Sequence, residues 1–281
     1  MTSRLQACNL QLAYGDTVVD GLDLEVFDGT VTAVIGPNGC GKSTLLRALG
    51  RLLPTKRGHV LLDGKRIDRM PTRAVAMVLG ILPQALIAPE GLTVADLVAR
   101  GRHPHQAWYR QWASDDEEAV EQALGWTGMT ELAQRSVDSL SGGQRQRAWI
   151  SMALAQGTDV LLLDEPTTFL DLAHQVDVLD LVERLHTEAG RTVVMVLHDL
   201  NLAARYAQRL VAMRDGRIVV EGPVDQVLTE AMLREVFELD AKIVTDPMSG
   251  TPLVVPIGRR HRAPADVTGI SPDLRRSPSC P

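Results

Sequence analysis

Short apolar runs that alternate with helical periods dominate the hydrophobic pattern of this chain. Val31 to Ile35, Val160 to Leu163 and Thr192 to Leu197 are compact runs of apolar and β-branched residues, which suit central strands buried on both faces of a parallel sheet. A helical stretch around Leu172 to Leu185 separates the last two runs and indicates a strand–helix–strand unit. The pattern therefore predicts an α/β fold.

Three further segments carry the signals of β-hairpins. Val60 to Ile67 and Val211 to Val220 each contain an Asp-Gly dipeptide between apolar flanks, and Ala241 to Ile257 divides into two short strands around a polar turn. Helical periods dominate from residue 93 to about residue 156. Within that region we expect a helix to begin at Ser114, with Glu117 as its capping-box partner.

Composition and charge place the chain among ordinary globular proteins and narrow its partners. It has 281 residues, of which 45% are hydrophobic and 23% charged. Its net charge of -6 and pI of about 5.7 argue against a nucleic-acid partner, because such partners favour a basic footprint. No stretch reaches the roughly 18 consecutive apolar residues of a membrane helix, and the first residues lack a signal-peptide core. We therefore expect a cytosolic protein that another chain anchors if it acts at a membrane.

The end of the chain is predicted to be disordered, and the cysteines are not expected to form disulfides or a metal site. From Gly258 onward the sequence is rich in Arg, Pro and Ser, so we predict a disordered tail over residues 258–281. Cys8, Cys40 and Cys280 are far apart and form no metal-type pair. Nothing in their spacing suggests disulfides, which fits a reducing compartment.

A glycine-rich segment follows the first buried run and leads into a helix that we expect over Ser43 to Leu49, with Gly50 as its stop. Glycines let the backbone curl until several N–H groups point at one phosphate, and the helix adds its positive N-terminal end. In this pattern the lysine reaches the β- and γ-phosphates of ATP and the next hydroxyl ligates Mg²⁺. The sequence therefore predicts a Walker A phosphate-binding loop, an ATP site formed by Gly36, Pro37, Asn38, Gly39, Cys40, Gly41, Lys42, Ser43 and Thr44.

The run that begins at Val160 ends in Asp164 and Glu165, which matches the Walker B pattern. A buried parallel strand carries its last residues to the carboxyl edge of the sheet, where α/β proteins place their ligands. Asp164 is therefore expected to hold Mg²⁺ together with Ser43. Glu165 is expected to polarise the water that attacks the γ-phosphate. An acidic pair alone is weak evidence, but the Walker A segment before it favours this interpretation.

The sequence Leu140-Ser141-Gly142-Gly143-Gln144 lies just upstream of the Walker B strand and resembles the signature of the ABC family of ATPases. Ser141 is placed to cap a helix, with Gln144 at the capping-box position. In that family the helix end faces the γ-phosphate of ATP bound to a second subunit. The resemblance therefore implies a trans ATP contact for Ser141, Gly142, Gly143 and Gln144.

Further positions match motifs of the same family in the same order. Tyr14 stands where the family stacks an aromatic ring on adenine, and Asp171 matches the D-loop that bridges the two subunits. Gln84 follows an expected strand over Val78 to Leu82 and matches the Q-loop glutamine, which senses Mg²⁺ and the membrane partner. His198 matches the switch histidine at the γ-phosphate. The resemblance thus implies catalytic roles for Glu165, His198, Lys42 and Gln84, and Mg²⁺ ligation by Ser43, Gln84 and Asp164.

The resemblance covers residues 2–257 and implies a RecA-like P-loop NTPase core. An antiparallel β subdomain and a helical subdomain inserted at about residues 93–156 complete the expected ABC ATPase architecture. ATP and Mg²⁺ are the implied cofactors. Each copy supplies half of a site, so the implied active unit is a dimer with a second copy or a homologous ATPase subunit. Integral membrane permease subunits and, indirectly, a substrate-binding protein are the other implied partners, which would place the chain at the cytoplasmic face of the inner membrane.

Three stretches resemble in particular the ATPases of iron(III)–siderophore importers: residues 99–106, 166–175 and 197–206. The related haem and vitamin B12 importers share much of this sequence, so both remain alternatives. Non-transport ABC ATPases fit less well, because this chain lacks a long coiled-coil insertion before the signature and carries a single cassette. Direct iron binding by His103, His105 and His174 is not expected, because the iron arrives chelated on the far side of the membrane.

Cys40 lies inside the predicted phosphate-binding loop, near a helix N-terminus that can lower the pKa of a thiol. One hypothesis is that alkylation of Cys40 blocks ATP binding. The alternative is that Cys40 is a small side chain tolerated at this position.

Overall fold

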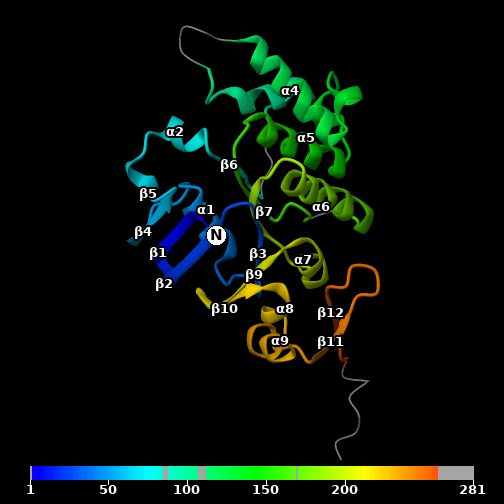
Figure 1. Cartoon of the computed structure of the whole chain (residues 1–281). Helices are drawn as coiled ribbons and strands as arrows, with labels where there is room; N and C mark the ends of the chain where they lie inside the picture. The colour runs from blue at the N-terminus through cyan, green and yellow to red at the C-terminus, as the bar shows by residue number, and fades with distance from the viewer. Residues whose placement is uncertain (1, 85–87, 107–111, 169, 259–281) are drawn as a thin grey trace, which may run out of the picture.

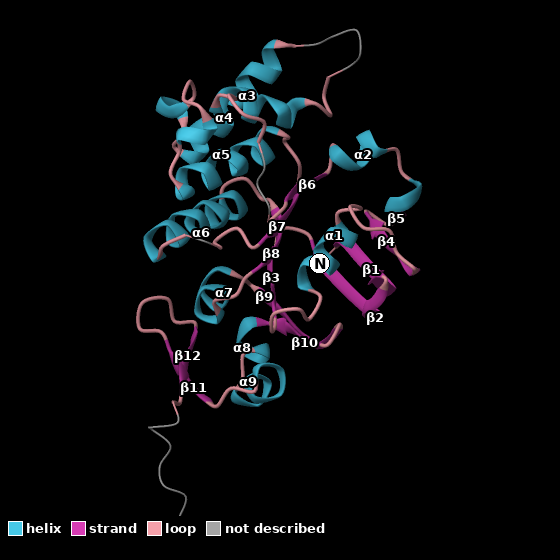
Figure 2. Ribbon diagram, turned by 180° about the vertical axis from the view of Figure 1, so that it is seen from behind, coloured by secondary structure: helices cyan, strands magenta, loops and turns pink. Residues whose placement is uncertain are grey.

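The computed structural model describes residues 2–84, 88–106, 112–168 and 170–258. A six-stranded sheet runs through the centre, a four-stranded sheet lies to one side, and a group of helices gathers at one end (Figure 1). Short helices and a two-stranded hairpin lie at the opposite end (Figure 2). Apart from Gly258, the predicted disordered tail lies outside the described residues and stays a prediction.

The central sheet is parallel except at one edge, which confirms the expected α/β fold. Three of its inner strands are largely apolar, and every residue in them is buried, as the sequence pattern predicts. Among the described strands of this sheet, only the edge strand β10 pairs antiparallel to its neighbour. In spatial order the strands are β10 (Arg217–Pro223), β9 (Arg209–Arg214), β3 (Val31–Ile35), β8 (Thr192–Val196), β7 (Val160–Asp164) and β6 (Leu79–Leu82).

The second sheet is antiparallel and covers the helix that follows the glycine-rich loop. It consists of β2 (Asp16–Phe27), β1 (Ser3–Tyr14), β4 (Arg57–Leu62) and β5 (Lys65–Arg66). The helix α1 (Lys42–Leu49) is buried through Leu45, Leu46 and Leu49, which share one apolar core with the second sheet and one face of the central sheet. The start of α1 is therefore fixed from two sides.

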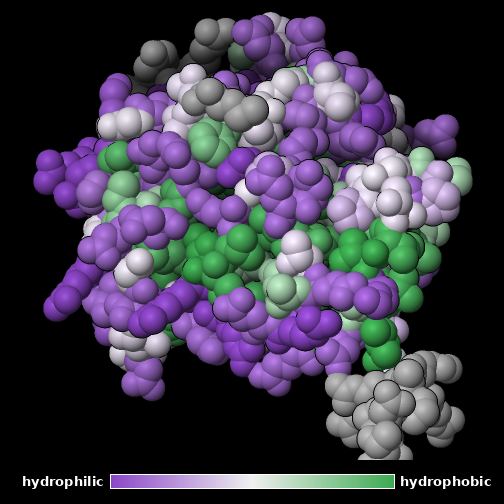
Figure 3. All heavy atoms as spheres, turned by 60° about the horizontal axis from the view of Figure 1, so that its bottom comes forward, coloured by the Kyte–Doolittle hydropathy of each residue, from purple (hydrophilic) through white to green (hydrophobic). Residues whose placement is uncertain are grey.

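Helices cover the other face of the central sheet and form the larger core. These are α6 (Leu172–Thr187), α7 (Leu200–Tyr206), α8 (Val224–Val227) and α9 (Glu230–Phe237). The hairpin of β11 (Ala241–Thr245) and β12 (Pro252–Pro256) docks on α7, because the Asn201 side chain exchanges two hydrogen bonds with the backbone of Val254. Figure 3 brings this end of the molecule forward and shows a band of apolar residues between polar ones. All three hairpins expected from the sequence are confirmed.

The helical region contains α3 (Val94–Ala99), α4 (Ser114–Thr127) and α5 (Gly142–Ala155), whereas α2 (Thr72–Ala76) lies outside it, just before β6. A buried ion pair joins its parts: Arg102 Nε lies 2.9 Å from Asp116 Oδ1 on α4, and Arg102 Nη1 donates to the carbonyl of Ala155 at the end of α5. The expected capping box of α4 is wrong by one residue. Ala113 is the N-cap, and its N–H donates to Asp116 rather than to Glu117, because the ion pair holds Asp116 inward.

Replacing Arg102 by Met should lower the free energy of unfolding by about 2–4 kcal/mol, because it leaves the buried Asp116 carboxylate without its partner. Urea titration of the full chain measures the loss. The matched control is Arg66→Met, which removes the exposed pair with Asp68 and should cost at most about 1 kcal/mol.

The ion pair of Arg102 and Asp116 should make the free energy of unfolding depend on pH. Burial alone raises the pKa of Asp116, but the hydrogen bonds from Arg102 and Ala113 outweigh it and hold the pKa below its ordinary value. The stabilisation is therefore present above the unfolded-state pKa of about 4 and is lost as pH falls through the lower folded-state pKa. The difference between wild type and Arg102→Met should shrink below about pH 4. An equal difference at pH 7 and pH 3 would contradict this account.

Candidate functional site

The loop between β3 and α1 forms a backbone cradle. Gly39 and Gly41 have positive φ angles of 78° and 102°, which favour glycine. Gly36 sits so close to the backbone of Met213 that a side chain would collide with its carbonyl. Lys42 Nζ donates to the carbonyls of Gly36 and Pro37 at 2.8 and 2.9 Å. The loop is thus closed around the lysine, and the N–H groups at the start of α1 lack partners within the helix.

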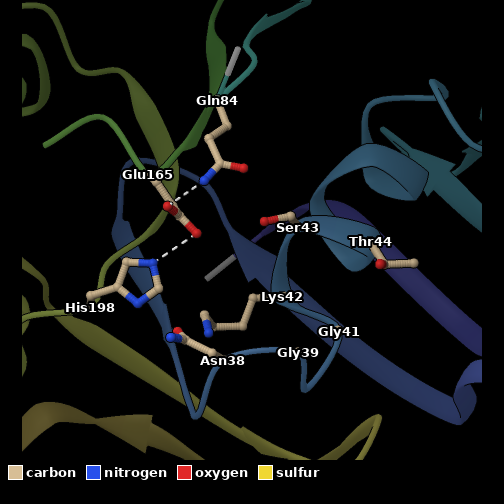
Figure 4. A pocket seen from close by; sticks show the side chains of 9 residues that line it. All are labelled: Asn38, Gly39, Gly41, Lys42, Ser43, Thr44, Gln84, Glu165 and His198. Carbon is tan, nitrogen blue, oxygen red and sulfur yellow. Dashed lines mark hydrogen bonds and ion pairs between the residues drawn. The ribbon is translucent and has the colours of Figure 1, made fainter. Parts of the chain in front are cut away.

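This loop borders a cavity of about 590 Å³ (Figure 4). The residues that the sequence predicted for phosphate, magnesium and water chemistry converge there from separate parts of the chain. The cavity is lined by Asn38, Gly39, Gly41, Lys42, Ser43, Thr44, Gln84, Glu165 and His198. A mixed lining of ammonium, hydroxyl, amide and carboxylate groups suits a nucleotide phosphate chain.

A hydrogen bond ties α1 to the end of β7. The Ser43 hydroxyl donates to Asp164 Oδ1 at 2.7 Å, and Asp164 is 2% exposed. Burial raises the pKa of Asp164, and the hydrogen bond from Ser43 opposes this only in part. Asp164 Oδ2 has no hydrogen-bond partner within the described residues, and the Arg47 guanidinium lies 3.9 Å away. A buried, under-satisfied carboxylate beside a hydroxyl is a donor set that fits Mg²⁺, which prefers oxygen ligands.

The Glu165 carboxylate is held by three side chains. Gln84 Nε2 donates to Oε2 at 2.7 Å, and His198 Nε2 lies 2.7 Å from Oε1 (Figure 4). Thr168 Oγ1 donates to Oε2 at 3.0 Å. Glu165 has a φ of 54°, a strained value for a residue other than glycine, so the backbone here turns sharply after β7. The side chain is therefore aimed into the cavity rather than left free.

Thr168 was not among the predicted site residues. It lies three positions after Glu165, and its N–H also donates to the Glu165 carbonyl at 3.2 Å, which closes a tight turn. The Pro-Thr-Thr sequence after the acidic pair is a turn signal that pointed to this geometry.

Other predicted residues lie outside the cavity of this single copy. Ser141 caps α5 as expected: the Gln144 N–H donates to Ser141 Oγ and the Ser141 N–H donates to Gln144 Oε1. Asp171 caps α6. Tyr14 is 56% exposed, and its hydroxyl accepts from Arg47 at 3.4 Å. The predicted roles of the signature residues and Asp171 need a second copy, and that of Tyr14 needs bound adenine, so all of them stay proposals.

The lowered pKa that motivated the alkylation hypothesis for Cys40 is wrong, whereas the hypothesis itself, that alkylation blocks ATP binding, stays a prediction. Cys40 is 6% exposed, and burial raises the pKa of its thiol, which the nearby Lys42 offsets only in part. The sulfur lies beside Gly36, since a Cβ added there would approach it to 2.8 Å, and the backbone N–H groups of Lys42 and Cys40 lower its pKa by less than burial raises it. Burial therefore raises the pKa of the Cys40 thiol by more than the start of α1 lowers it.

Two histidines of the siderophore-like stretches, His105 and His174, have structural partners. His105 Nε2 lies 2.7 Å from the carbonyl of Gln156, and His174 Nδ1 lies 2.6 Å from Asp171 Oδ1. In the part of the chain that the structure describes, no group of three or more His, Cys, Asp or Glu side chains is arranged to hold a metal. Within the same ranges, the helices are too short or too polar to cross a membrane.

The fold and the cavity define an ATPase of the P-loop class, and comparison with known proteins gives the family. The sequence pattern of the ABC transporter family matches residues 19–168. The petrobactin import ATP-binding protein of Bacillus anthracis is 53% identical over 95% of this chain and 98% of its own length. The ferric enterobactin transport ATP-binding protein of Escherichia coli is 52% identical over 92% of this chain and 94% of its own. The chain therefore belongs to the ABC transporter family, as an ATP-hydrolysing subunit.

More distant matches agree with this family. A cobalamin import ATP-binding protein of Halobacterium salinarum is 39% identical over 95% of this chain and 67% of its own length. A metal-chelate type ABC transporter solved in an inward-facing conformation has a TM-score of 0.80 at 31% identity, with 92% of this chain and 99% of that chain covered. A dimeric cassette with ADP and phosphate bound has a TM-score of 0.70 at 28% identity, with 78% and 98% covered.

Buried and with a raised pKa, Cys40 should react slowly with iodoacetamide at pH 7 and faster as pH rises toward 9, because the thiolate is the reactive form. Site-resolved mass spectrometry of the native chain separates Cys40 from the half-buried Cys8, which is the internal comparison. Rapid labelling of Cys40 at pH 7 would contradict the buried location of its thiol.

Proposed function

We propose that this chain is the Mg²⁺-dependent ATPase of an importer that takes up iron(III)–siderophore complexes, and that it works at the cytoplasmic face of the inner membrane as a peripheral subunit. The observation that carries the ATPase part is the Glu165 carboxylate, clamped by Gln84, Thr168 and His198 at the mouth of the phosphate cradle. A carboxylate fixed at that place can accept a proton from an attacking water.

The proposed roles follow from the positions of the groups. Lys42 and the loop amides from Gly36 to Thr44 bind the β- and γ-phosphates, and the Tyr14 ring stacks on adenine. Glu165 orients the attacking water, while Gln84 and His198 hold Glu165 and face the γ-phosphate. In phosphoryl transfer most of the acceleration comes from such positioning and from charge stabilisation.

Ser43, Asp164 and Gln84 are the residues that would hold Mg²⁺. The support is the buried Asp164 oxygen without a hydrogen-bond partner beside the Ser43 hydroxyl. When bound, Mg²⁺ neutralises charge on the β- and γ-phosphates.

One copy supplies half of the proposed site. The signature turn, Ser141 to Gln144, is a helix N-terminus whose first amides are available to an anion, yet it does not line the copy's own cavity. We infer that it contacts ATP bound to a second copy or a homologous subunit, with Asp171 bridging the two. A related cassette is dimeric in a post-hydrolysis state with ADP and phosphate. Binding of ATP would then close the pair and hydrolysis would open it.

Siderophore complexes are the proposed cargo because the two relatives named for petrobactin and ferric enterobactin transport are 53% and 52% identical. The cobalamin relative is 39% identical, so vitamin B12, and haem by analogy, are the weaker alternative. Membrane permease subunits and a substrate-binding protein complete the proposed complex, which contains no nucleic acid.

Glu165→Gln should lower the ATPase kcat by about 10²- to 10⁴-fold while ATP binding persists, because the amide cannot accept the proton. Steady-state hydrolysis and equilibrium binding of a fluorescent ATP analogue measure the two quantities. The matched control is Glu188→Gln, which changes the exposed pair with Arg184 and should leave both unchanged. Full activity of Glu165→Gln would refute the proposed role.

The cargo is tested by uptake in the source cells. Cells that carry Glu165→Gln should lose uptake of one class of labelled ferric siderophore, while Glu188→Gln cells should resemble wild type. Loss of vitamin B12 or haem uptake instead, with every ferric siderophore unaffected, would overturn the siderophore assignment and leave the ATPase intact.

A further inference from the structure

The ring of His174 packs directly against Gly143 of the signature turn. A Cβ added at Gly143 would lie 2.5 Å from His174 Cδ2, 3.0 Å from Cγ and 3.2 Å from Nε2, so the three nearest atoms all belong to this one ring. A Cβ added at the neighbouring Gly142 would meet no atom within 4 Å. The backbone of Gly143 is helical, so an alanine is compatible with its φ angle. On this copy, the obstacle to a side chain at Gly143 is His174.

The ring is held in place by Asp171. Both the backbone N–H of His174 and its Nδ1 atom engage Asp171 Oδ1, at 3.0 and 2.6 Å. These hydrogen bonds, the backbone one foremost, lower the pKa of Asp171, so its carboxylate persists in mildly acidic solution. Asp171 also begins α6 as its N-cap. The His174 ring can therefore leave this position only if its Nδ1 contact with the N-cap residue of α6 is broken.

The contact joins two parts of the molecule. Gly143 lies at the start of α5 in the helical region, whereas His174 lies at the start of α6, which packs on the central sheet (Figure 1). Both helix ends belong to surfaces that the proposed function turns toward a second copy. The distance between the signature amides and Asp171 then decides whether both can contact the second copy at the same time.

We propose that His174 is a positioning residue that sets the signature turn against Asp171, so that the two act as one surface for the ATP-bound partner. The inference rests on the proposed ATP-bridged dimer. It also gives Gly143 a reason to lack a side chain, because an added methyl group would push the His174 ring and tilt the start of α5.

A double-mutant cycle tests the proposal in the full chain with Glu165→Gln, in which ATP persists. Sedimentation velocity measures ATP-driven dimerisation of the parent, Gly143→Ala, His174→Ala and the double variant. In the chain that keeps His174, Gly143→Ala should weaken dimerisation by about tenfold or more. The His174→Ala chain should itself dimerise more weakly, and in it Gly143→Ala should have little further effect.

Gly142→Ala is the matched control. It adds the same methyl group to the same helix turn without meeting His174, so its effect should be equal in both backgrounds. Binding of a fluorescent ATP analogue to the single copy should be unchanged in His174→Ala, because His174 does not line the phosphate cavity. Thermal unfolding without nucleotide confirms that each variant is folded.

The outcomes separate the inference from the function on which it rests. If Gly143→Ala weakened dimerisation equally with and without His174, then only the partner's nucleotide would exclude a side chain at Gly143. That result would overturn the proposal. If Gly143→Ala and His174→Ala were coupled in thermal unfolding but not in dimerisation, their contact would be a structural one only. That result would also overturn the proposal. A parent that stays monomeric with ATP would instead contradict the proposed dimer itself.

Discussion

The parallel pairing of β6, β7 and β8 is the constraint on which the site depends. Leu82 is opposite Leu163, and Asp164 is opposite Val196, so these strands end at one edge of the sheet. The residues that follow, Gln84, Glu165 and His198, therefore meet although they are far apart in sequence. A slip of one residue in either pairing would turn side chains to the opposite face and separate the three. Strands β7 and β8 resist such a slip, because they are largely apolar and both of their faces are packed.

Most of the cavity could be predicted from the sequence, because its chemistry lies in short local motifs. The Walker A loop, the acidic pair after β7 and the glutamine and histidine after neighbouring strands each have a local pattern, and the order of strands in a parallel sheet brings them together. The cap of α4 could not be predicted, because a distant partner, Arg102, decides which acid turns inward. The pKa of Cys40 likewise depends on burial by residues distant in sequence, which the local helix-end argument ignores.

The stretch 99–106, which carries part of the siderophore-importer resemblance, has a packing role in this chain. Gly101 lies so close to the backbone of Met152 that no side chain would fit, Arg102 ties α4 to the end of α5, and His105 bonds to the carbonyl of Gln156. These contacts bind the helical region into one unit around α5. The start of α5 bears the signature turn, so any motion of the helical region moves that turn relative to the cavity.

The central claim is that each copy holds half of a site that only a second copy completes. The most direct test is the ATPase rate per copy of the purified full chain, measured at saturating ATP across a wide range of protein concentrations. A site shared between copies predicts a rate per copy that rises with concentration and then levels off as dimers form. A rate per copy that stays constant down to the lowest concentration, in a protein shown to be monomeric there, would contradict the claim.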